Sequence, residues 1–259
     1  KTTYRMMGIA DYITLLNGLF GTAAILFIIL AVEDLHKPYY QGGLNTNYIW
    51  LAMLCILASV IGDIIDGPIA RKYSKRKLLG GSLDIMSDSL SFCVAPALLI
   101  FVMFGRWGEA SPFWTVSLAI ASCWIIATGM LRLARFQYEQ ASDLNHFVGL
   151  SSPANALLIL SFAGLIWIQP STGLGPGLTT WDCSICFGTG TAKPYFDFLI
   201  LPIMFISGGL MISDKPLSKL KGGIVMKLSI IQLLAILVGI VYSLIQTTNS
   251  DNGQHGSGM

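Results

Sequence analysis

The sequence predicts an all-α integral membrane protein, and three observations support this class. Of its 259 residues, 54% are hydrophobic and only 12% are charged, about half the charged share of an ordinary soluble domain. The mean hydropathy is +0.67. Several apolar stretches also reach the roughly 20 residues that a helix needs to cross a bilayer. A soluble globular domain is excluded because its surface would remain apolar, and intrinsic disorder is excluded for the same reason.

Seven stretches fit a transmembrane helix in length and polarity. In chain order they are 12–32, 47–66, 83–104, 112–131, 150–168, 195–213 and 226–246. The residues before the first stretch, 1–11, are short and mixed in polarity, and we expect them to form an interfacial helix beneath it. The last stretch lies after a basic loop and before a polar tail, 248–259, which we expect to be disordered.

The positions of the basic residues indicate how the spans are oriented. With the N-terminus inside, 13 of the 16 Lys and Arg residues fall in inner segments and 3 in outer ones. Short loops rich in Lys and Arg stay in the cytoplasm, so this split puts 71–81 and 132–149 inside and 169–194 outside. If 226–246 crosses the membrane, the C-terminus lies outside; if it does not, the C-terminus stays inside.

Two further features exclude or weaken other kinds of site. The outer loop contains Cys183 and Cys186, whose spacing fits a disulfide or an incidental pair. Two thiols supply only half of a structural zinc site, so a metal there is the weaker interpretation. The chain has no long basic stretch of the kind that binds nucleic acid.

Four acidic residues lie where a membrane protein rarely keeps charge. Asp63 and Asp66 end the second stretch, and Asp84 and Asp88 begin the third. Spacings of three and four residues place each pair on one face of its helix. Because the short segment 71–81 joins the two helices, their acidic faces can meet. We therefore predict that the four carboxylates converge one or two turns in from the cytoplasmic surface.

Four carboxylates this close cannot all stay ionised alone, so either some are protonated or cations are bound. Ligands made only of oxygen select hard ions such as Mg²⁺, Mn²⁺ or Ca²⁺, and this many anionic ligands suit two ions. The small residues Gly67, Ala70 and Gly80 let a bulky ligand approach the backbone. Arg71 adds a guanidinium suited to phosphate oxygens. The pattern indicates phosphoryl chemistry on a lipid.

Together these residues form a motif. Residues 63–71 read DIIDGPIAR and residues 80–88 read GGSLDIMSD, which resembles the CDP-alcohol phosphotransferase signature DxxDGxxAR followed by GxxxDxxxD. The resemblance covers the first six spans and implies a six-helix membrane fold, commonly a homodimer. Residues 1–213 would then be the membrane-embedded catalytic core. Residues 214–259 would add the basic loop, a seventh span and the disordered tail.

Members of this family move a phosphatidyl-type group from a CDP-lipid to an alcohol and release CMP. The resemblance assigns Asp63, Asp66 and Asp84 as ligands of Mg²⁺ or Mn²⁺, with Ca²⁺ as a further possible occupant. It gives Asp88 a shared role between metal and acceptor, and Asp88 is the best-placed general base. The site would face the cytoplasm of a prokaryotic cell membrane. The expected CDP-lipid contacts are Thr14, Asn17, Asp63, Gly67, Ala70, Arg71 and Gly80.

The acceptor follows from the next part of the chain. Residues 89–97 read SLSFCVAPA and residues 131–136 read LRLARF, which resembles the phosphatidylserine synthase branch and implies L-serine as acceptor. The departures are Cys93, where Gly is usual, and Ile85-Met86 in place of smaller residues. The candidate contacts to serine or to a phosphate are Ser89, Ser91, Arg132 and Arg135.

Other interpretations remain open at this stage. The same fold could use glycerol phosphate, an inositol phosphate or ethanolamine as acceptor, and the lipid could be diacylglycerol or an archaeal ether lipid. A divalent-cation transporter is a more distant alternative. Transporters hold such sites near the bilayer midplane on broken helices, whereas these acids lie near the cytoplasmic ends of their spans, which favours the enzyme.

Overall fold

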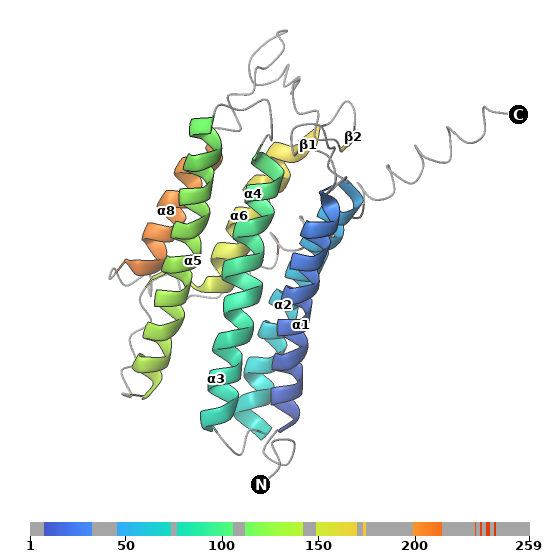
Figure 1. Cartoon of the computed structure of the whole chain (residues 1–259). Helices are drawn as coiled ribbons and strands as arrows, with labels where there is room; N and C mark the ends of the chain where they lie inside the picture. The colour runs from blue at the N-terminus through green and yellow to red at the C-terminus, as the bar shows by residue number, and fades with distance from the viewer. Residues whose placement is uncertain are drawn as a thin grey trace, which may run out of the picture.

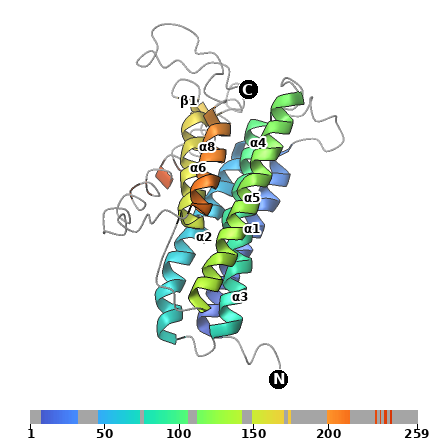
Figure 2. The same cartoon turned by 90° about the vertical axis from the view of Figure 1, so that its left-hand side faces the viewer.

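The computed structural model shows a bundle of long helices that run up and down alongside one another (Figures 1 and 2). It describes residues 8–32, 46–73, 77–105, 112–141, 149–169, 173–174 and 199–213, with the isolated positions 231, 234, 237, 238 and 241. The side chains of 66–73 and 77–79 lie outside the described part, although the backbone there is helical.

The described helices follow the order of the first six predicted spans. The first two are α1 (Ile9–Ala31) and α2 (Thr46–Tyr73). A continuous helical rod then consists of α3 (Lys77–Asp88), the π-helix η2 (Ser89–Val94) and α4 (Ala95–Phe104). It is followed by α5 (Pro112–Ala141), α6 (Ser152–Trp167) and α8 (Ile200–Ile212). A short antiparallel pair, β1 (Ile168–Gln169) with β2 (Gly173–Leu174), follows α6.

Four of these helical segments are long and apolar enough to cross a membrane: Asp11–Ala31, Asn47–Ile65, Gly80–Phe104 and Phe113–Tyr138. They confirm the predicted spans 12–32, 47–66, 83–104 and 112–131. The predicted spans 150–168 and 195–213 correspond to shorter apolar helices, Ser152–Gly164 and Ile200–Ile212. Apart from the short β1–β2 pair, the described part is therefore helical, as in a multi-pass membrane protein. These helix lengths do not settle the predicted count of six helices plus one.

Three predictions fall largely outside the described residues. The N-terminal interfacial helix was expected over 1–11, of which only residues 8–11 are described, with α1 beginning at Ile9. Of the predicted seventh span, the structure describes only five isolated positions. The Cys183 and Cys186 pair and the tail 248–259 lie in undescribed segments.

The apolar core fills the half of the bundle that lies away from the start of α1. Its largest fully buried side chains include Trp50, Met53, Leu99, Ile100 and Phe104. They come from the first half of α2 and from α4, and they belong to one cluster with the C-terminal half of α1. One face of α1 instead exposes leucine side chains, among them Leu19 and Leu26, as expected of a helix surface that meets lipid.

The π-helix η2 follows Asp88 directly and is explained by the proline just after it. Pro96 has no backbone N–H, so it cannot donate to the Phe92 carbonyl as an α-helical residue would. The Ala95 N–H instead reaches the Leu90 carbonyl five residues back. This wider turn shifts the register between α3 and α4, and such turns are common at functional sites.

The helices differ in how far they extend along the bundle. The lower ends of α1, α2 and α3 lie side by side at one level, together with the C-terminal end of α5 (Figures 1 and 2). In contrast, α6 begins and α8 ends part-way up the bundle. The predicted site lies toward these lower ends of α2 and α3.

Candidate metal and CDP-lipid site

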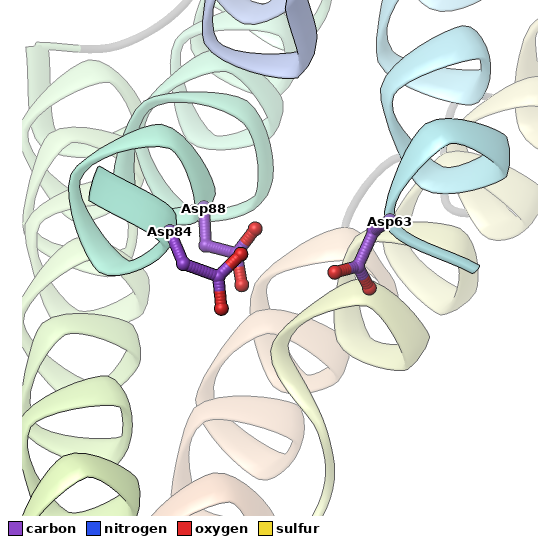
Figure 3. A group of neighbouring side chains, drawn as sticks. All are labelled: Asp63, Asp84 and Asp88. Carbon is purple, nitrogen blue, oxygen red and sulfur yellow. The ribbon is translucent and has the colours of Figure 1, made fainter. Parts of the chain in front are cut away.

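Three of the four predicted carboxylates lie together between α2 and α3. Asp63 comes from α2 and faces Asp84 and Asp88 of α3 (Figure 3). Each of the three half-buried residues offers a carboxylate oxygen, and these oxygens all lie within 4.8 Å of one another. The convergence predicted from helical spacing is confirmed for these three residues.

Local helix geometry explains this arrangement. Asp84 and Asp88 are one turn apart on α3, so their side chains extend over the same face. Asp63 lies before the end of α2, and the chain between α2 and α3 is short. Two antiparallel helices joined so closely must bring these faces together near the connection.

The remaining motif residues lie on the same helix, but only their backbone is described. Asp66, Gly67, Ala70 and Arg71 are all within α2, which remains helical from Thr46 to Tyr73. Asp66 follows Asp63 by three residues, so its backbone position is on the same side of α2. Whether the Asp66 carboxylate and the Arg71 guanidinium belong to the site remains a prediction from the sequence.

The donor set fits a hard divalent cation. Its three side chains contribute only carboxylate oxygens, which is the ligand chemistry of Mg²⁺, Mn²⁺ and Ca²⁺. Oxygens on opposite sides of such an ion are separated by about twice a bond length of 2.0–2.6 Å. The observed limit of 4.8 Å falls within that range. The described residues can therefore hold a divalent metal, with the identity and number of ions left to experiment.

Serine hydroxyls attach α1 to the helices that carry the carboxylates. Ser87, which precedes Asp88, donates a hydrogen bond to the Thr14 carbonyl at 2.8 Å. Ser91 and Ser59 both donate to the Asn17 carbonyl, at 3.0 and 3.2 Å. All three hydroxyls are buried. Ser91 was predicted as an acceptor contact; its hydroxyl donates to α1, and contact with an acceptor stays a prediction.

Glycine residues let α1 come this close. A Cβ atom added at Gly62, next to Asp63, would overlap the side-chain amide oxygen of Asn17 and lie 2.7 Å from its Cγ. A Cβ atom at Gly18 would lie 3.1 Å from the Ser87 hydroxyl. The buried Asn17 side chain therefore rests against the residue before Asp63, which brings it to the edge of the carboxylate group. Thr14, also buried, lies one turn earlier on α1.

A fifth carboxylate, missed by the sequence analysis, lies at the start of α1. Asp11 is only 6% exposed. Its Oδ2 accepts the Gly8 backbone N–H at 2.7 Å, which caps the helix start. Its Oδ1 lies 2.7 Å from the position of a Cβ atom built on Gly80. Acidic residues are common in the first helical turn, so the sequence offered no reason to single out Asp11.

Arg132 of α5 is held next to the start of α6. Its Nε donates to the Leu150 carbonyl at 2.8 Å, and its guanidinium lies 5.6 Å from the centre of the Phe136 ring. Asp88 and Arg132 both act electrostatically on the Cys93 thiol, so both lie near it. Arg135, the other predicted arginine, is exposed, and Ser89 is half-buried.

Two buried polar residues in the first turn of α6 were also missed. Ser152 and Asn155 are both fully buried, and neither side chain has a hydrogen-bond partner in the described part of the chain. They follow Leu150, the residue that holds Arg132. Polar residues at a helix start are usually assigned to capping, so the sequence offered no reason to single them out.

Comparison with known proteins decides the family. The family model described as CDP-alcohol phosphatidyltransferase matches residues 7–189, which is well over half of the chain and includes the three clustered aspartates. The chain belongs to this family. The resemblance read from the motif in 63–88 is thereby confirmed.

Several curated relatives within this CDP-alcohol phosphatidyltransferase family are similar to the chain. A CDP-diacylglycerol–serine O-phosphatidyltransferase of Methanocaldococcus jannaschii is 34% identical over 163 residues, covering 62% of this chain and 63% of the relative. The enzyme of the same name from Saccharomyces cerevisiae is 31% identical, covering 61% and 54%. An archaetidylserine synthase of Methanothermobacter thermautotrophicus is 31% identical, covering 62% and 60%. The chain thus spans less than two thirds of the length of these relatives.

Proposed function

We propose that this protein transfers a phosphatidyl-type group from a CDP-lipid to the hydroxyl of L-serine and releases CMP. The observation that carries the proposal is the convergence of Asp63, Asp84 and Asp88 within a CDP-alcohol phosphatidyltransferase match. The relatives named above act on serine by their printed names, which supports serine over other alcohols.

The proposed metal ligands are Asp63, Asp84 and Asp88, with Asp66 as the fourth. A divalent cation held there, Mg²⁺ or Mn²⁺ in one or two copies, would supply positive charge to the pyrophosphate of the CDP-lipid. Arg71 would add a permanent positive charge on the same helix. Because the three clustered aspartates are half-buried, electrostatic interactions with the pyrophosphate would be stronger there than in bulk water.

The bond changes are those of a single displacement. The serine hydroxyl oxygen forms a bond to the phosphorus that carries the lipid, and the bond from this phosphorus to the CMP oxygen breaks. The hydroxyl proton passes to the Asp88 carboxylate, the general base. Asp88 suits this role because it directly precedes η2, and both Asp88 and Arg132 act electrostatically on Cys93 in that segment.

We assign the acceptor to the side of Asp88 that faces α5 and α6. Arg132, held by the Leu150 carbonyl, is the candidate partner for the serine carboxylate, and the exposed Arg135 and half-buried Ser89 are further candidates. Ser91, whose hydroxyl donates to the Asn17 carbonyl on α1, is a further candidate contact to serine. The nucleotide is assigned to the other side, along Thr14, Asn17, Gly67, Ala70 and Gly80.

The proposed setting is a prokaryotic cell membrane, with the site facing the cytoplasm. We further propose a homodimer in which each protomer has a six-helix core and a seventh span. Single cysteines at position 75 and in 169–194, labelled from each side in a variant without native cysteines, test the orientation. Labelling of position 75 only from outside would contradict it. Cross-linking of the purified protein tests the dimer.

One experiment tests the reaction itself. Purified protein is incubated with labelled CDP-diacylglycerol or CDP-archaeol, Mg²⁺ or Mn²⁺, and one acceptor at a time. We expect CMP release and a serine-containing lipid with L-serine, and little product with glycerol phosphate, an inositol phosphate or ethanolamine. Product with one of those acceptors instead would keep the reaction class and overturn serine. Absence of CMP release with every acceptor would overturn the enzyme.

A further inference from the structure

The Arg132 side chain is held by a backbone carbonyl that is itself held by another helix. Its Nε donates to the Leu150 carbonyl at 2.8 Å. The Leu150 N–H in turn donates to the Leu210 carbonyl, in the last turn of α8, at 3.2 Å. Leu150 therefore links α5 to α8 through both of its backbone polar groups, and the end of α8 decides where the acceptor for Arg132 lies.

Gly149 is the residue that allows this link. Its φ is +83°, and it is the only glycine with a positive φ in the described part of the chain. Residues with a side chain rarely adopt this conformation. A Cβ atom added at Gly149 would lie 2.8 Å from the Met211 carbonyl oxygen and 3.3 Å from those of Leu210 and Ser213. Because these neighbours are backbone atoms, a side chain there must push this segment away from α8.

The helix α8 is attached to α5 a second time, two turns before Arg132. The Trp124 Nε1 donates to the Phe205 carbonyl at 3.3 Å. A Cβ atom added at Gly208 would lie 2.5 Å from the same Nε1, so the two helices are in close contact there. The contacts thus form a closed ring, from α5 to α8, from α8 to Leu150, and from Leu150 back to α5. Such a ring sets the position of the Arg132 side chain relative to its own helix.

The orientation of a guanidinium matters more than that of a simple point charge. The group is planar and presents its donors in a fixed fork that matches a carboxylate. Once the Leu150 carbonyl accepts from Nε, the direction of the two terminal nitrogens of Arg132 is set as well. Displacement of that carbonyl would turn the fork, while Asp63, Asp84 and Asp88 stay on α2 and α3.

We propose that Gly149 and Leu150 are positioning residues, which transmit the position of the α8 end to the Arg132 guanidinium and so set the affinity for the carboxylate of an amino-acid acceptor. The proposal rests on the proposed function and deepens it. It also gives a role to α8, which carries none of the predicted site residues. Neither positioning residue contacts the reacting atoms, so acceptor affinity should change without a matching change in the chemical step.

The main test is Gly149→Ala in the purified full-length protein, with KM and kcat measured by CMP release. The KM for L-serine should rise at least about tenfold, the effect of one hydrogen bond between charged groups. The kcat at saturating serine and the KM for the CDP-lipid should stay within about twofold. Gly209→Ala, whose Cβ atom meets nothing within 4 Å, is the matched control on α8 and should leave all three values unchanged.

A second variant separates backbone strain from the close approach to α8. Asn tolerates a positive φ better than Ala does, so Gly149→Asn keeps the backbone conformation and adds only the contact with the α8 carbonyls. It should fold even where Gly149→Ala does not, and it should raise the KM for serine in the same way. An unchanged KM for serine, or a fall in kcat with equal losses for serine and CDP-lipid, would overturn the proposal.

A double-mutant cycle tests whether Gly149 acts through Arg132. Arg132→Lys keeps the positive charge but removes the fork, and it should raise the KM for serine by itself. Adding Gly149→Ala to it should raise this KM by less than about twofold, because the shared interaction is already lost. Two effects that multiply would show that Gly149 acts by another route. If the original protein releases no CMP with serine, the proposed function fails; if it does and Gly149→Ala keeps its KM, only this inference fails.

Discussion

The two halves of the bundle are held together in different ways. In the half near the start of α1, the buried residues include a polar group: Asp11, Thr14, Asn17, Ser87 and Ser91. Their contacts are serine hydroxyls on backbone carbonyls, made possible by glycines. In the other half, large apolar side chains such as Trp50 and Phe104 fill the core.

This difference shows which half of the bundle holds its helices at defined distances and rotations, and which half is held by apolar packing. A hydrogen bond from a serine to a carbonyl sets both the distance and the rotation of two helices, whereas apolar packing tolerates exchange of similar side chains. Small residues and hydrogen bonds are also the usual means of helix association inside a membrane. The half that carries the carboxylates is thus the half in which helix positions are most closely defined.

The largest expected effect is the loss of one carboxylate from the polar half. Asp63→Asn and Asp84→Asn should each lower turnover by at least ~10³-fold, because the charge that stabilises the reacting phosphate contributes several kcal/mol. The metal-dependent rise in thermal stability should disappear as well. Thermal unfolding with and without Mn²⁺, and CMP release, measure both. Activity close to that of the original protein at low Mn²⁺ would contradict the ligand role.

Asp88→Asn should separate chemistry from binding. Loss of a general base lowers kcat by ~10²–10⁴-fold, while CDP-lipid affinity should fall less than in Asp63→Asn because the other carboxylates still hold the metal. Affinity and turnover are measured on the same preparation. If affinity falls as steeply as turnover, Asp88 is primarily a metal ligand and another group accepts the proton.

Gly62→Ala should disturb the polar half without removing any functional group. Its methyl would overlap the Asn17 amide, so α1 or α2 must move beside Asp63. We expect a fall in turnover of ~10–100-fold, as misplacement of catalytic groups by about 1 Å produces, and a loss of ~1–3 kcal/mol in stability. Gly164→Ala, whose Cβ atom meets nothing within 4 Å, is the control and should keep activity.

Two serine variants compare the halves directly. Ser87 donates to the Thr14 carbonyl and Ser122 donates to the Ala97 carbonyl at 3.3 Å, so Ser87→Ala and Ser122→Ala each remove a buried bond between helices. Both should cost about 0.5–1.5 kcal/mol of stability. Only Ser87→Ala should lower turnover, by about two- to fivefold on the same hydrogen-bond scale. Equal turnover in the two variants would show that the bond does not position Asp88.

The smallest expected effect on turnover comes from the apolar half. Leu99→Ala removes a fully buried side chain from α4 and should destabilise the protein by ~2–5 kcal/mol. Turnover per folded molecule should stay within about twofold, since a distant core cavity lies outside the reacting groups. Thermal unfolding and CMP release at a temperature well below the transition measure the two quantities. A loss of turnover comparable to that of Gly62→Ala would remove the distinction between the halves.

Local sequence properties were enough to predict most of the fold and the centre of the site. Apolar length located the helices, since a segment must satisfy its own backbone hydrogen bonds in lipid. Helical spacing brought Asp84 and Asp88 to one face, and the short connection between helices brought Asp63 opposite them. Both inferences depend only on neighbours in the chain.

Only the tertiary structure decided how the helices rotate and which faces meet. The hydrogen bond from the Ser91 hydroxyl, in η2, to the Asn17 carbonyl on α1 could not be predicted from the sequence. Asp11 and Gly80 are far apart in sequence, yet the packing of α1 on α3 brings the carboxylate to the glycine. Hydropathy and periodicity show which face of a helix is polar or apolar, but not which other helix that face contacts. A contact between helices depends on their relative rotation and depth, which many residues determine together.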